Sequence, residues 1–438
     1  MEFYDTLYII NKGGYLMKKS FLKAITSILL ALVLIACSIV PCFATDNAEA
    51  EEKYPFIFCH GMMGWGEGAP MLDFMGPYWG GSEEAHIIPY LESQGYDVYY
   101  PAMGGISSAW DRACELYAWL CGTVVDYGEA HANEHGHDRY GRDYTGRAIM
   151  GEPWDMETKL NLIGHSFGGA TVRLFASLLA YGDEAEIAAS GDECSELFKG
   201  GHTDVINSIT TLAAPHNGTI VANHANDLFV LGFIFTLMEH FMGVAGSSMM
   251  DPVLDHWGLS APYGSGEFVM FNPVKMMKFF LSKDQCFYDM TLWGAEELNE
   301  KIKTVDSIYY ISYACRGTSP GFLGLEWPKS GMFPFFYLTF GFISWSEGLT
   351  VDGYYMDESW TVSDGIVPLN SALYPYSDAD NTAPFPGVEN AERGIWYTMP
   401  VMENYDHFDF CTSERGFETV ENYHAFFLGL VEMINSLE

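Results

Sequence analysis

The stretch KLNLIGHSFGGATVR, residues 159–173, decides the fold. An apolar, strand-like run ends at Gly164, and a G-x-S-x-G motif centred on Ser166 follows it. From Phe167 to Tyr181 the apolar residues recur at helical spacing. A G-x-S-x-G motif between a strand and a helix is a nucleophile elbow, a sharp turn that presents the serine hydroxyl. We therefore predict Ser166 as a nucleophile at the end of a parallel strand.

Other apolar runs along the chain have the length and composition of buried strands. They lie at 55–59, 96–100, 205–213 and 307–314, and the amphipathic segment 420–437 predicts a terminal helix. Strands that alternate with helices form a parallel sheet covered on both faces. We therefore predict an α/β protein with a mostly parallel central sheet flanked by helices, in one domain over 54–438.

A serine hydroxyl needs a base and an orienting acid to become a nucleophile. In folds with this elbow the chain order is serine, acid, histidine. His407 lies in a polar loop before the terminal helix and is the predicted base, whereas His424 lies within that helix and is predicted to be structural. Asp364, in a loop and followed by glycine, is the predicted acid. The weaker candidates for the acid are Asp352, Asp357 and Asp406.

An oxyanion formed at the serine needs two backbone N–H donors. One comes from the residue after the nucleophile, Phe167. The other is expected from the loop after the first strand, where residues 60–66 read HGMMGWG and Met62 is the predicted donor.

A histidine-rich segment is a second candidate site. Asp111 is followed about twenty residues later by His131, His135 and His137. Nitrogen and oxygen ligands of this kind bind metals such as zinc. The alternative is a polar insertion that carries histidines by chance, and spacing alone does not decide which histidines bind.

Two segments are unusually rich in phenylalanine, at 220–250 and 331–345. Apolar runs are usually core. Each of these runs follows a strand, however, and a lid that covers an apolar cleft would have the same composition.

Composition excludes several classes of protein. The 438 residues include 58 acidic and 21 basic side chains, a formal net charge of −37, and 16% of them are aromatic. A disordered chain has few aromatic residues, and an acidic surface repels nucleic acid. For the same reason the protein is not attracted electrostatically to anionic lipid, so any contact with lipid must be apolar. No obligate protein partner is evident.

The N-terminus has the pattern of a secretory signal over 17–44, with lysines before an apolar run and a cleavage site after Ala44. We expect Met17 to be the true start, residues 1–16 an upstream extension, and 45–53 an acidic linker. The protein would then be secreted. The alternatives are a lipoprotein anchored through Cys37 and a segment that stays uncleaved in the membrane.

Nine stretches lie in order along the chain: HGMMGWG (60–66), YWGG (78–81), SSAWDRACE (107–115), GTVVDYG (122–128), HGH (135–137), FKGGH (198–202), PHNGT (215–219), LDHWGL (254–259) and DGIV (364–367). Together they resemble the zinc-containing thermoalkalophilic bacterial lipases, relatives of the staphylococcal lipases.

The resemblance implies an α/β-hydrolase fold with a zinc insertion at about 105–150 and a helical lid at about 220–250. It assigns the nucleophile to Ser166, the acid to Asp364 and the base to His407. It also implies a structural zinc, whose ligands would be Asp111, His131, His137 and Asp255.

The family also binds calcium just after the base. Asp409 stands at one ligand position, and the other calcium-binding residues are replaced in this chain.

These observations predict a secreted serine hydrolase of carboxylic esters, in first place a triacylglycerol lipase that acts at a lipid–water interface. One alternative is a carboxylesterase on short soluble esters, in which the phenylalanine-rich segments are core. Another is a catalytically silent lipid-binding protein that keeps the fold.

Overall fold

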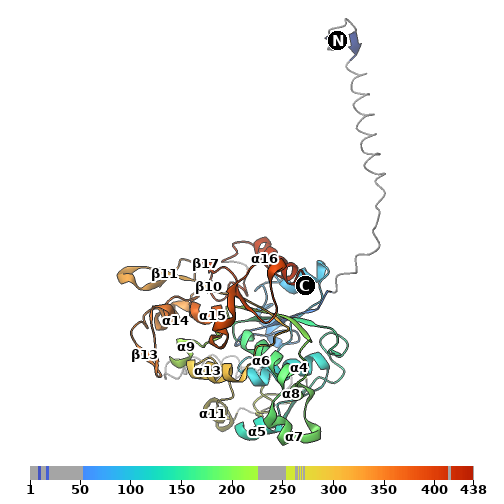
Figure 1. Cartoon of the computed structure of the whole chain (residues 1–438), viewed down its shortest axis with the longest axis vertical. Coiled ribbons are helices and arrows are strands. Elements are labelled where there is room, and N and C mark those ends of the chain that lie inside the picture. Colours follow the sequence, from blue (N-terminus) through green and yellow to red (C-terminus); the bar gives the residue numbers. More distant parts are fainter. Residues whose placement is uncertain are drawn as a thin grey trace. The chain divides into compact units, whose positions relative to one another are not determined.

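A computed structural model describes residues 53–224, 253–261, 265, 267, 269, 272–412 and 416–437, with two short strands near the N-terminus. The chain divides into two units, Met1–Glu52 and Lys53–Glu438 (Figure 1). In the first unit, β1 (Tyr8–Ile10) and β2 (Leu16–Lys18) pair antiparallel. The rest of the predicted signal segment lies outside the described residues. Within the described part of the chain, no helix has both the length and the hydropathy needed to span a membrane.

The second unit is built on a seven-stranded sheet whose strands are all parallel. This confirms the predicted α/β class with a parallel central sheet. Because the strands are parallel, the loops that follow β3 and β7 leave the same edge of the sheet. In spatial order the strands are β15 (Thr382–Pro384), β16 (Trp396–Thr398), β9 (Tyr309–Tyr313), β8 (Ile206–Leu212), β7 (Leu160–His165), β3 (Phe56–Cys59) and β4 (Val98–Tyr99).

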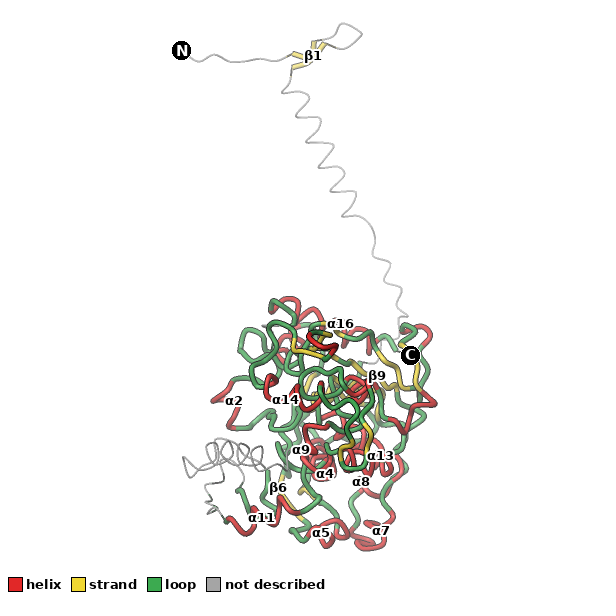
Figure 2. The backbone as a smooth tube through the Cα atoms, turned by 90° about the vertical axis from the view of Figure 1, so that its left-hand side faces the viewer, coloured by secondary structure: helices red, strands yellow, loops and turns green. Residues whose placement is uncertain are grey.

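The two faces of the sheet form two apolar cores. Successive side chains of a strand point to opposite faces, so Ile57 and Cys59 of β3 join one core and Phe56 and Phe58 the other. The first core packs α4 (Ala109–Cys121) and α6 (Gly168–Tyr181), and the second packs α3 (Ile87–Ser93) and α16 (Val420–Asn435). Figures 1 and 2 both place α16 at one end of this unit and α4 toward the other. Each apolar side chain buried in this way contributes roughly 1.5–3 kcal/mol.

Residues 105–150, the predicted insertion, contain α4 and a small antiparallel pair formed by β5 (Val124–Asp126) and β6 (Tyr140–Asp143). Helix α5 (Glu129–His135) lies between these two strands in the sequence. This arrangement brings the histidine-rich segment beside the start of α4.

The two phenylalanine-rich segments have different outcomes. The first begins with α9 (Ile220–His224), and its remainder lies outside the described residues, so the predicted lid there stays a prediction. The second contains α14 (Phe336–Ser344), in which Phe336 and Phe340 are buried while Tyr337 and Leu338 are exposed. This helix is therefore half core and half surface.

The remaining described helices and strands are short or peripheral. They are α2 (Pro70–Met75), α7 (Glu184–Ser190), α8 (Glu196–Lys199), α11 (Pro273–Leu281), α12 (Cys286–Asp289), α13 (Leu292–Lys301), α15 (Leu369–Leu373), β10 (Cys315–Arg316), β11 (Thr318–Pro320), β12 (Glu326–Pro328), β13 (Thr350–Val351), β14 (Tyr354–Tyr355) and β17 (Met402–Glu403).

Candidate active site

Ser166 lies on the sharp turn between β7 and α6. Its backbone has φ +54°, in the left-handed region that side chains other than glycine rarely adopt. A Cβ atom on Gly164 would lie 2.5 Å from the carbonyl oxygen of Gly168, and one on Gly168 would lie 2.3 Å from that of Cys59. The two glycines of the motif are therefore required by the close approach of strand and helix. This is the local geometry of a nucleophile elbow.

The structure brings the predicted base and acid to Ser166. The Nε2 atom of His407 lies 2.8 Å from Ser166 Oγ, and its Nδ1 atom lies 2.7 Å from Asp364 Oδ2. The other oxygen of Asp364 accepts the N–H groups of Ile366 and Val367, at 3.0 and 2.7 Å. All three side chains of the constellation are buried. An Nδ1–H that donates to the carboxylate leaves the Nε2 lone pair facing the serine hydroxyl.

The weaker candidates for the acid have other partners. Asp406 accepts the N–H groups of Phe333 and Phe408, at 2.7 and 2.9 Å, and so fixes the loop that leads into α14. Asp352 accepts a hydrogen bond from the side chain of Asn223, and Asp357 caps a short 3-10 helix. His424, predicted to be structural, stacks on Tyr90 with ring centroids 4.0 Å apart.

The two predicted oxyanion donors belong to the residue after Ser166 and to the loop after β3, whose Gly61 approaches Ser166. Within the part of the chain that the structure describes, neither the Met62 N–H nor the Phe167 N–H donates a hydrogen bond. Gly61 presses the first loop against the nucleophile, because a Cβ atom there would lie 2.7 Å from Ser166 Cβ. Phe167 precedes the first turn of α6, whose N-terminal end favours negative charge.

Arg112 of α4 contacts the loop after β3, residues 60–66, which carries the predicted oxyanion donor, and its side chain is fully buried. Its guanidinium donates to the carbonyl oxygens of His60 and Gly104, and its Nε donates to Thr171 Oγ1 of α6 at 2.9 Å. One side chain thus ties the loop after β3 to the helix that follows the nucleophile. Local sequence patterns do not predict this role, because His60 and Thr171 lie 52 and 59 residues from Arg112 along the chain.

A second chain of hydrogen bonds runs behind the nucleophile. Gly61 N–H donates to the Tyr78 hydroxyl at 3.0 Å, and that hydroxyl lies 2.6 Å from Nδ1 of His165. The Nε2 atom of His165 lies 2.9 Å from the carbonyl oxygen of His407. Burial, and after it the nearby His407, holds the pKa of His165 well below its ordinary value. A neutral His165 donates from Nε2 and accepts at Nδ1, so the chain links the oxyanion loop to the loop of the base.

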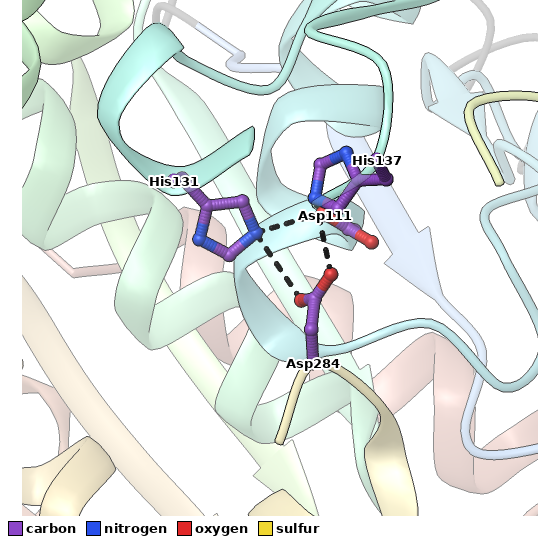
Figure 3. Close-up of side chains that lie close together, drawn as sticks. All are labelled: Asp111, His131, His137 and Asp284. Carbon is purple, nitrogen blue, oxygen red and sulfur yellow. Dashed lines mark ion pairs between the residues drawn. The ribbon is translucent and has the colours of Figure 1, made fainter. Parts of the chain in front are cut away.

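The histidine-rich segment forms a compact cluster with two carboxylates. Ligand atoms of Asp111, His131, His137 and Asp284 all lie within 4.8 Å of one another (Figure 3). His131 Nε2 lies 3.3 Å from Asp111 Oδ1 and 3.2 Å from Asp284 Oδ1, and His137 Nε2 lies 3.2 Å from Asp284 Oδ2. Both carboxylates are fully buried. The cluster sits between α4, the end of α5 and the turn before α12.

The atoms of this cluster fit a metal ion. Asp111 Oδ1, both oxygens of Asp284 and the Nε2 atoms of the two histidines are buried without a hydrogen-bond partner. Buried polar atoms are almost always paired, so five such atoms facing one another indicate a shared cation. His137 Nδ1 lies 2.9 Å from the Asp138 carbonyl oxygen, which places its proton on Nδ1 and leaves Nε2 free to ligate.

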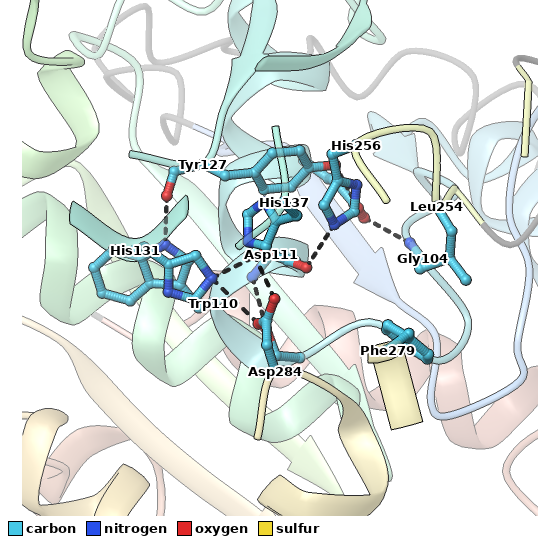
Figure 4. A network of polar contacts seen from close by, with 12 residues as sticks. Gly104, Trp110, Asp111, Tyr127, His131, His137, Leu254, His256, Phe279 and Asp284 are labelled. Atoms are coloured by element: carbon cyan, nitrogen blue, oxygen red, sulfur yellow. Dashed lines mark hydrogen bonds and ion pairs between the residues drawn. The ribbon is translucent and has the colours of Figure 1, made fainter. Parts of the chain in front are cut away.

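A second layer of side chains holds the cluster in place (Figure 4). His256 Nε2 lies 2.9 Å from Asp111 Oδ2, the oxygen that faces away from the cluster. Trp110 stacks on the His131 ring with centroids 5.0 Å apart and an interplanar angle of 16°. Partners of this kind orient ligands and tune their basicity.

The expected fourth ligand, Asp255, does not join this cluster. Its Oδ1 atom pairs with Arg142 Nη2 at 2.8 Å, and Asp284 occupies the place that the resemblance gave to Asp255. The physical reason is the short turn at 254–259, which points His256 at Asp111 and leaves its neighbour Asp255 toward β6. His135 is half-buried beside His131 and is outside the cluster.

The candidate calcium ligand Asp409 has backbone partners. Its Oδ2 accepts the Asp406 N–H at 2.6 Å and its Oδ1 accepts the Gly416 N–H at 2.8 Å. Residues 413–415, which include the nearby Glu414, lie outside the described residues. Calcium binding here therefore stays a prediction.

Known proteins resemble this chain over most of its length. The model of the lipase-like C-terminal domain family matches residues 52–437. The chain is 37% identical over 373 residues to lipase 2 of Staphylococcus aureus, across 83% of this chain and 51% of that protein, so it spans about half the length of this relative. EstA from Clostridium botulinum has a TM-score of 0.72 and 32% identity over 88% of both chains. The lipase of Staphylococcus hyicus has a TM-score of 0.70 and 31% identity, over 89% of this chain and 97% of that one.

Proposed function

Because the chain belongs to the lipase-like C-terminal domain family, with staphylococcal lipases among its relatives, we propose that it is a secreted serine hydrolase of carboxylic esters, a triacylglycerol lipase. One observation carries the proposal: the hydrogen-bonded line from Asp364 through His407 to Ser166 at the elbow. The substrate is a neutral ester lipid, in keeping with the acidic composition of the chain.

In the proposed reaction Ser166 Oγ attacks the ester carbonyl while His407 Nε2 takes its proton. Asp364 keeps the imidazole in the correct tautomer and stabilises the imidazolium that forms. The N–H groups of Met62 and Phe167 stabilise the oxyanion, and His407 returns the proton to the leaving alcohol. Water, activated by the same histidine, then releases the fatty acid from Ser166.

We also propose that the buried cluster binds zinc through Asp111, His131, His137 and Asp284. Two imidazoles and two carboxylates suit a tetrahedral zinc ion, and four protein ligands leave no open position. A bound zinc ion would therefore stabilise the fold around α4 and α5. The chemistry at Ser166 does not require it.

A carboxylesterase on short soluble esters is the second candidate. It is favoured by the buried side of α14, where Phe336 packs against His407 with ring centroids 6.1 Å apart and so behaves as core. The exposed side of the same helix favours a lipase. The two candidates predict opposite preferences between soluble and emulsified esters.

The test uses purified protein that begins after the acidic linker, with zinc present. An active-serine phosphonate should label wild type at Ser166 and leave Ser166→Ala unlabelled. Initial rates are then compared on p-nitrophenyl butyrate and on emulsified long-chain triglyceride. Faster turnover of the emulsion supports the lipase, and activity on the soluble ester alone supports the esterase. Folded, zinc-loaded wild type without labelling would overturn the hydrolase and support a silent lipid-binding protein.

A further inference from the structure

A hairpin near the candidate acid carries two large apolar side chains at its tip. Strands β11 and β12 pair antiparallel, and Phe322 and Leu323 lie between them, 74% and 77% exposed. Figure 1 shows this hairpin, labelled β11, extending away from the neighbouring elements. Such exposure of adjacent large apolar side chains at a protruding tip marks an interaction surface.

The backbone at the tip strengthens this reading. Leu323 has φ +64°, a left-handed conformation that favours glycine. With most of its side chain exposed, Leu323 gains little from internal packing that would offset this strain. The fold alone therefore favours glycine at this position, because the contacts of Leu323 within the molecule do not offset the strain.

The hairpin is held in one shape. Gly321 N–H donates to the Leu325 carbonyl at 2.8 Å, and the Trp327 indole N–H donates to the Phe322 carbonyl at 3.2 Å. The Trp327 ring fills the space beside Gly321, where a Cβ atom would lie 2.6 Å from it. A preorganised tip pays little ordering entropy when it binds.

The apolar surface continues from the hairpin onto α14. The Trp327 and Trp345 rings lie 5.8 Å apart, and Tyr337 and Leu338 of α14 are 49% and 65% exposed. Tryptophan and tyrosine favour the boundary between water and lipid, because their rings are apolar and their polar atoms remain hydrated. The surface therefore has an apolar tip bordered by aromatic side chains.

The base of the hairpin is tied to the candidate acid. Gly317 N–H donates to the Ser363 carbonyl at 2.9 Å, and Ser363 directly precedes Asp364. On its buried side, α14 contacts the His407 ring through Phe336. An object held by the hairpin tip and α14 would thus lie close to the candidate active site.

The charges on and around the hairpin indicate which kind of surface it binds. Residues 317–325 contain no charged side chain. The two cations at the base, Arg316 and Lys329, pair with Glu326 and Glu403 at 3.1 and 2.9 Å. Neither is left as a site for anionic headgroups, and the whole chain carries a charge of −37. The surface suits an uncharged or zwitterionic lipid rather than an anionic one.

We propose that the β11–β12 hairpin docks the protein on the surface of a neutral ester-lipid aggregate, with Phe322 and Leu323 inserted among the lipid chains. The proposal rests on the proposed function and adds to it the element that brings the site to its substrate. It also explains a strained, exposed leucine that the fold does not need.

The test measures binding separately from chemistry. Wild type, Leu323→Gly and the double variant Phe322→Ala/Leu323→Gly are first inactivated at Ser166 with the phosphonate, so that triolein is not hydrolysed. They are then mixed with triolein emulsion coated with phosphatidylcholine, and the bound fraction is determined by flotation. The control is Leu281→Ala on α11, where Leu281 is 80% exposed. We expect the partition coefficient to fall about 10-fold for Leu323→Gly and about 100-fold for the double variant, with little change for the control.

Three further readouts make the result decisive. Hydrolysis of p-nitrophenyl butyrate by the untreated proteins should be the same in all variants, and Leu323→Gly should melt no earlier than wild type, because glycine relieves the strain. Adding phosphatidylglycerol to the coat should not strengthen binding of wild type. If wild type does not hydrolyse the soluble ester, the proposed function is contradicted, and the partition coefficients still decide whether the hairpin docks. An unchanged partition coefficient in the double variant, an equal fall in the Leu281→Ala control, or tighter binding to the anionic coat would overturn the docking proposal.

Discussion

Replacing Asp284 by asparagine tests the metal cluster most directly. The carboxylate faces His131 Nε2 with one oxygen and His137 Nε2 with the other, both at 3.2 Å, and it is fully buried. Asparagine keeps the shape and removes the charge that a cation needs. Because substitution of an outer partner already weakens a metal site by roughly 10–100-fold, we expect loss of this ligand to weaken zinc binding by at least about 1,000-fold.

The expected change in stability follows from mass action. A ligand present at about 1,000 times its Kd stabilises the folded state by about 4 kcal/mol, and a 1,000-fold weaker site loses nearly all of this. For a domain of this size, that loss lowers Tm by roughly 5 °C. In excess chelator the gap between wild type and variant should largely close, since neither protein then has bound metal.

The assay is metal content by mass spectrometry together with thermal melting, with and without chelator. Asp255→Asn is the matched control. It breaks a mostly buried pair with Arg142, which should lower stability equally with and without chelator, and it should keep its metal. If Asp255→Asn lost the metal and Asp284→Asn kept it, the assignment of the fourth ligand would be refuted.

Three other substitutions give distinct results. Asp364→Asn should lower kcat by roughly 10⁴-fold, because the asparagine holds His407 in the wrong tautomer. Asp406→Asn only loosens the loop before α14 and should lower kcat by less than about 10-fold. Equal falls in kcat in steady-state assays would contradict the choice of acid. Tyr78→Phe leaves the Gly61 N–H unpaired and leaves His165 Nδ1 with only the weaker partner Cys411 Sγ at 3.3 Å, so we expect about 1–3 kcal/mol lower stability in urea and a kcat about 10-fold lower with little change in KM. A change confined to KM would argue against a positioning role. Burial, and after it Arg173, holds the pKa of His216 well below its ordinary value, so the folded protein keeps it neutral while the unfolded chain binds a proton below about pH 6.5. The stability that neutral His216 contributes is complete above that pH and is lost on acidification. In His216→Gln the free energy of unfolding should therefore fall less steeply below pH 6.5, by up to ~1.4 kcal/mol per pH unit. Identical urea midpoints in both proteins at every pH would exclude this role.

Local patterns predicted the centre of the fold well. The strand at 159–164 and the helix from 167 to 181 match β7 and α6 to within one or two residues, because an apolar strand, a turn and a helix are all encoded within one short stretch. The edge strand β15 and its neighbour β16 were not predicted. They are three residues each, and β15 ends in Pro384. β16 joins the sheet by pairing with β9, whose partner residues lie about 85 residues earlier in the chain, and β15 pairs only with β16.

The site residues show the same contrast between what local patterns encode and what distant contacts decide. Ser166, His407 and Asp364 were found because motif, chain order and loop polarity restrict the choice, and the structure brings these three together. Asp284 was missed because nothing in its neighbourhood distinguishes it from other acidic residues. Which carboxylate closes a site is decided by how the turn before α12 packs against α4, a contact that spacing does not encode.

Helix α4 also limits how this scaffold can be engineered. Asp111 faces the cluster while the next residue, Arg112, grips the loop that would stabilise the oxyanion. A library that randomises this helix to change the metal would alter turnover at the same time, and selection for activity alone would fix Arg112 while leaving Asp111 free to vary. Attempts to change substrate preference are better directed at the exposed side of α14, whose side chains contact neither Asp111 nor Arg112.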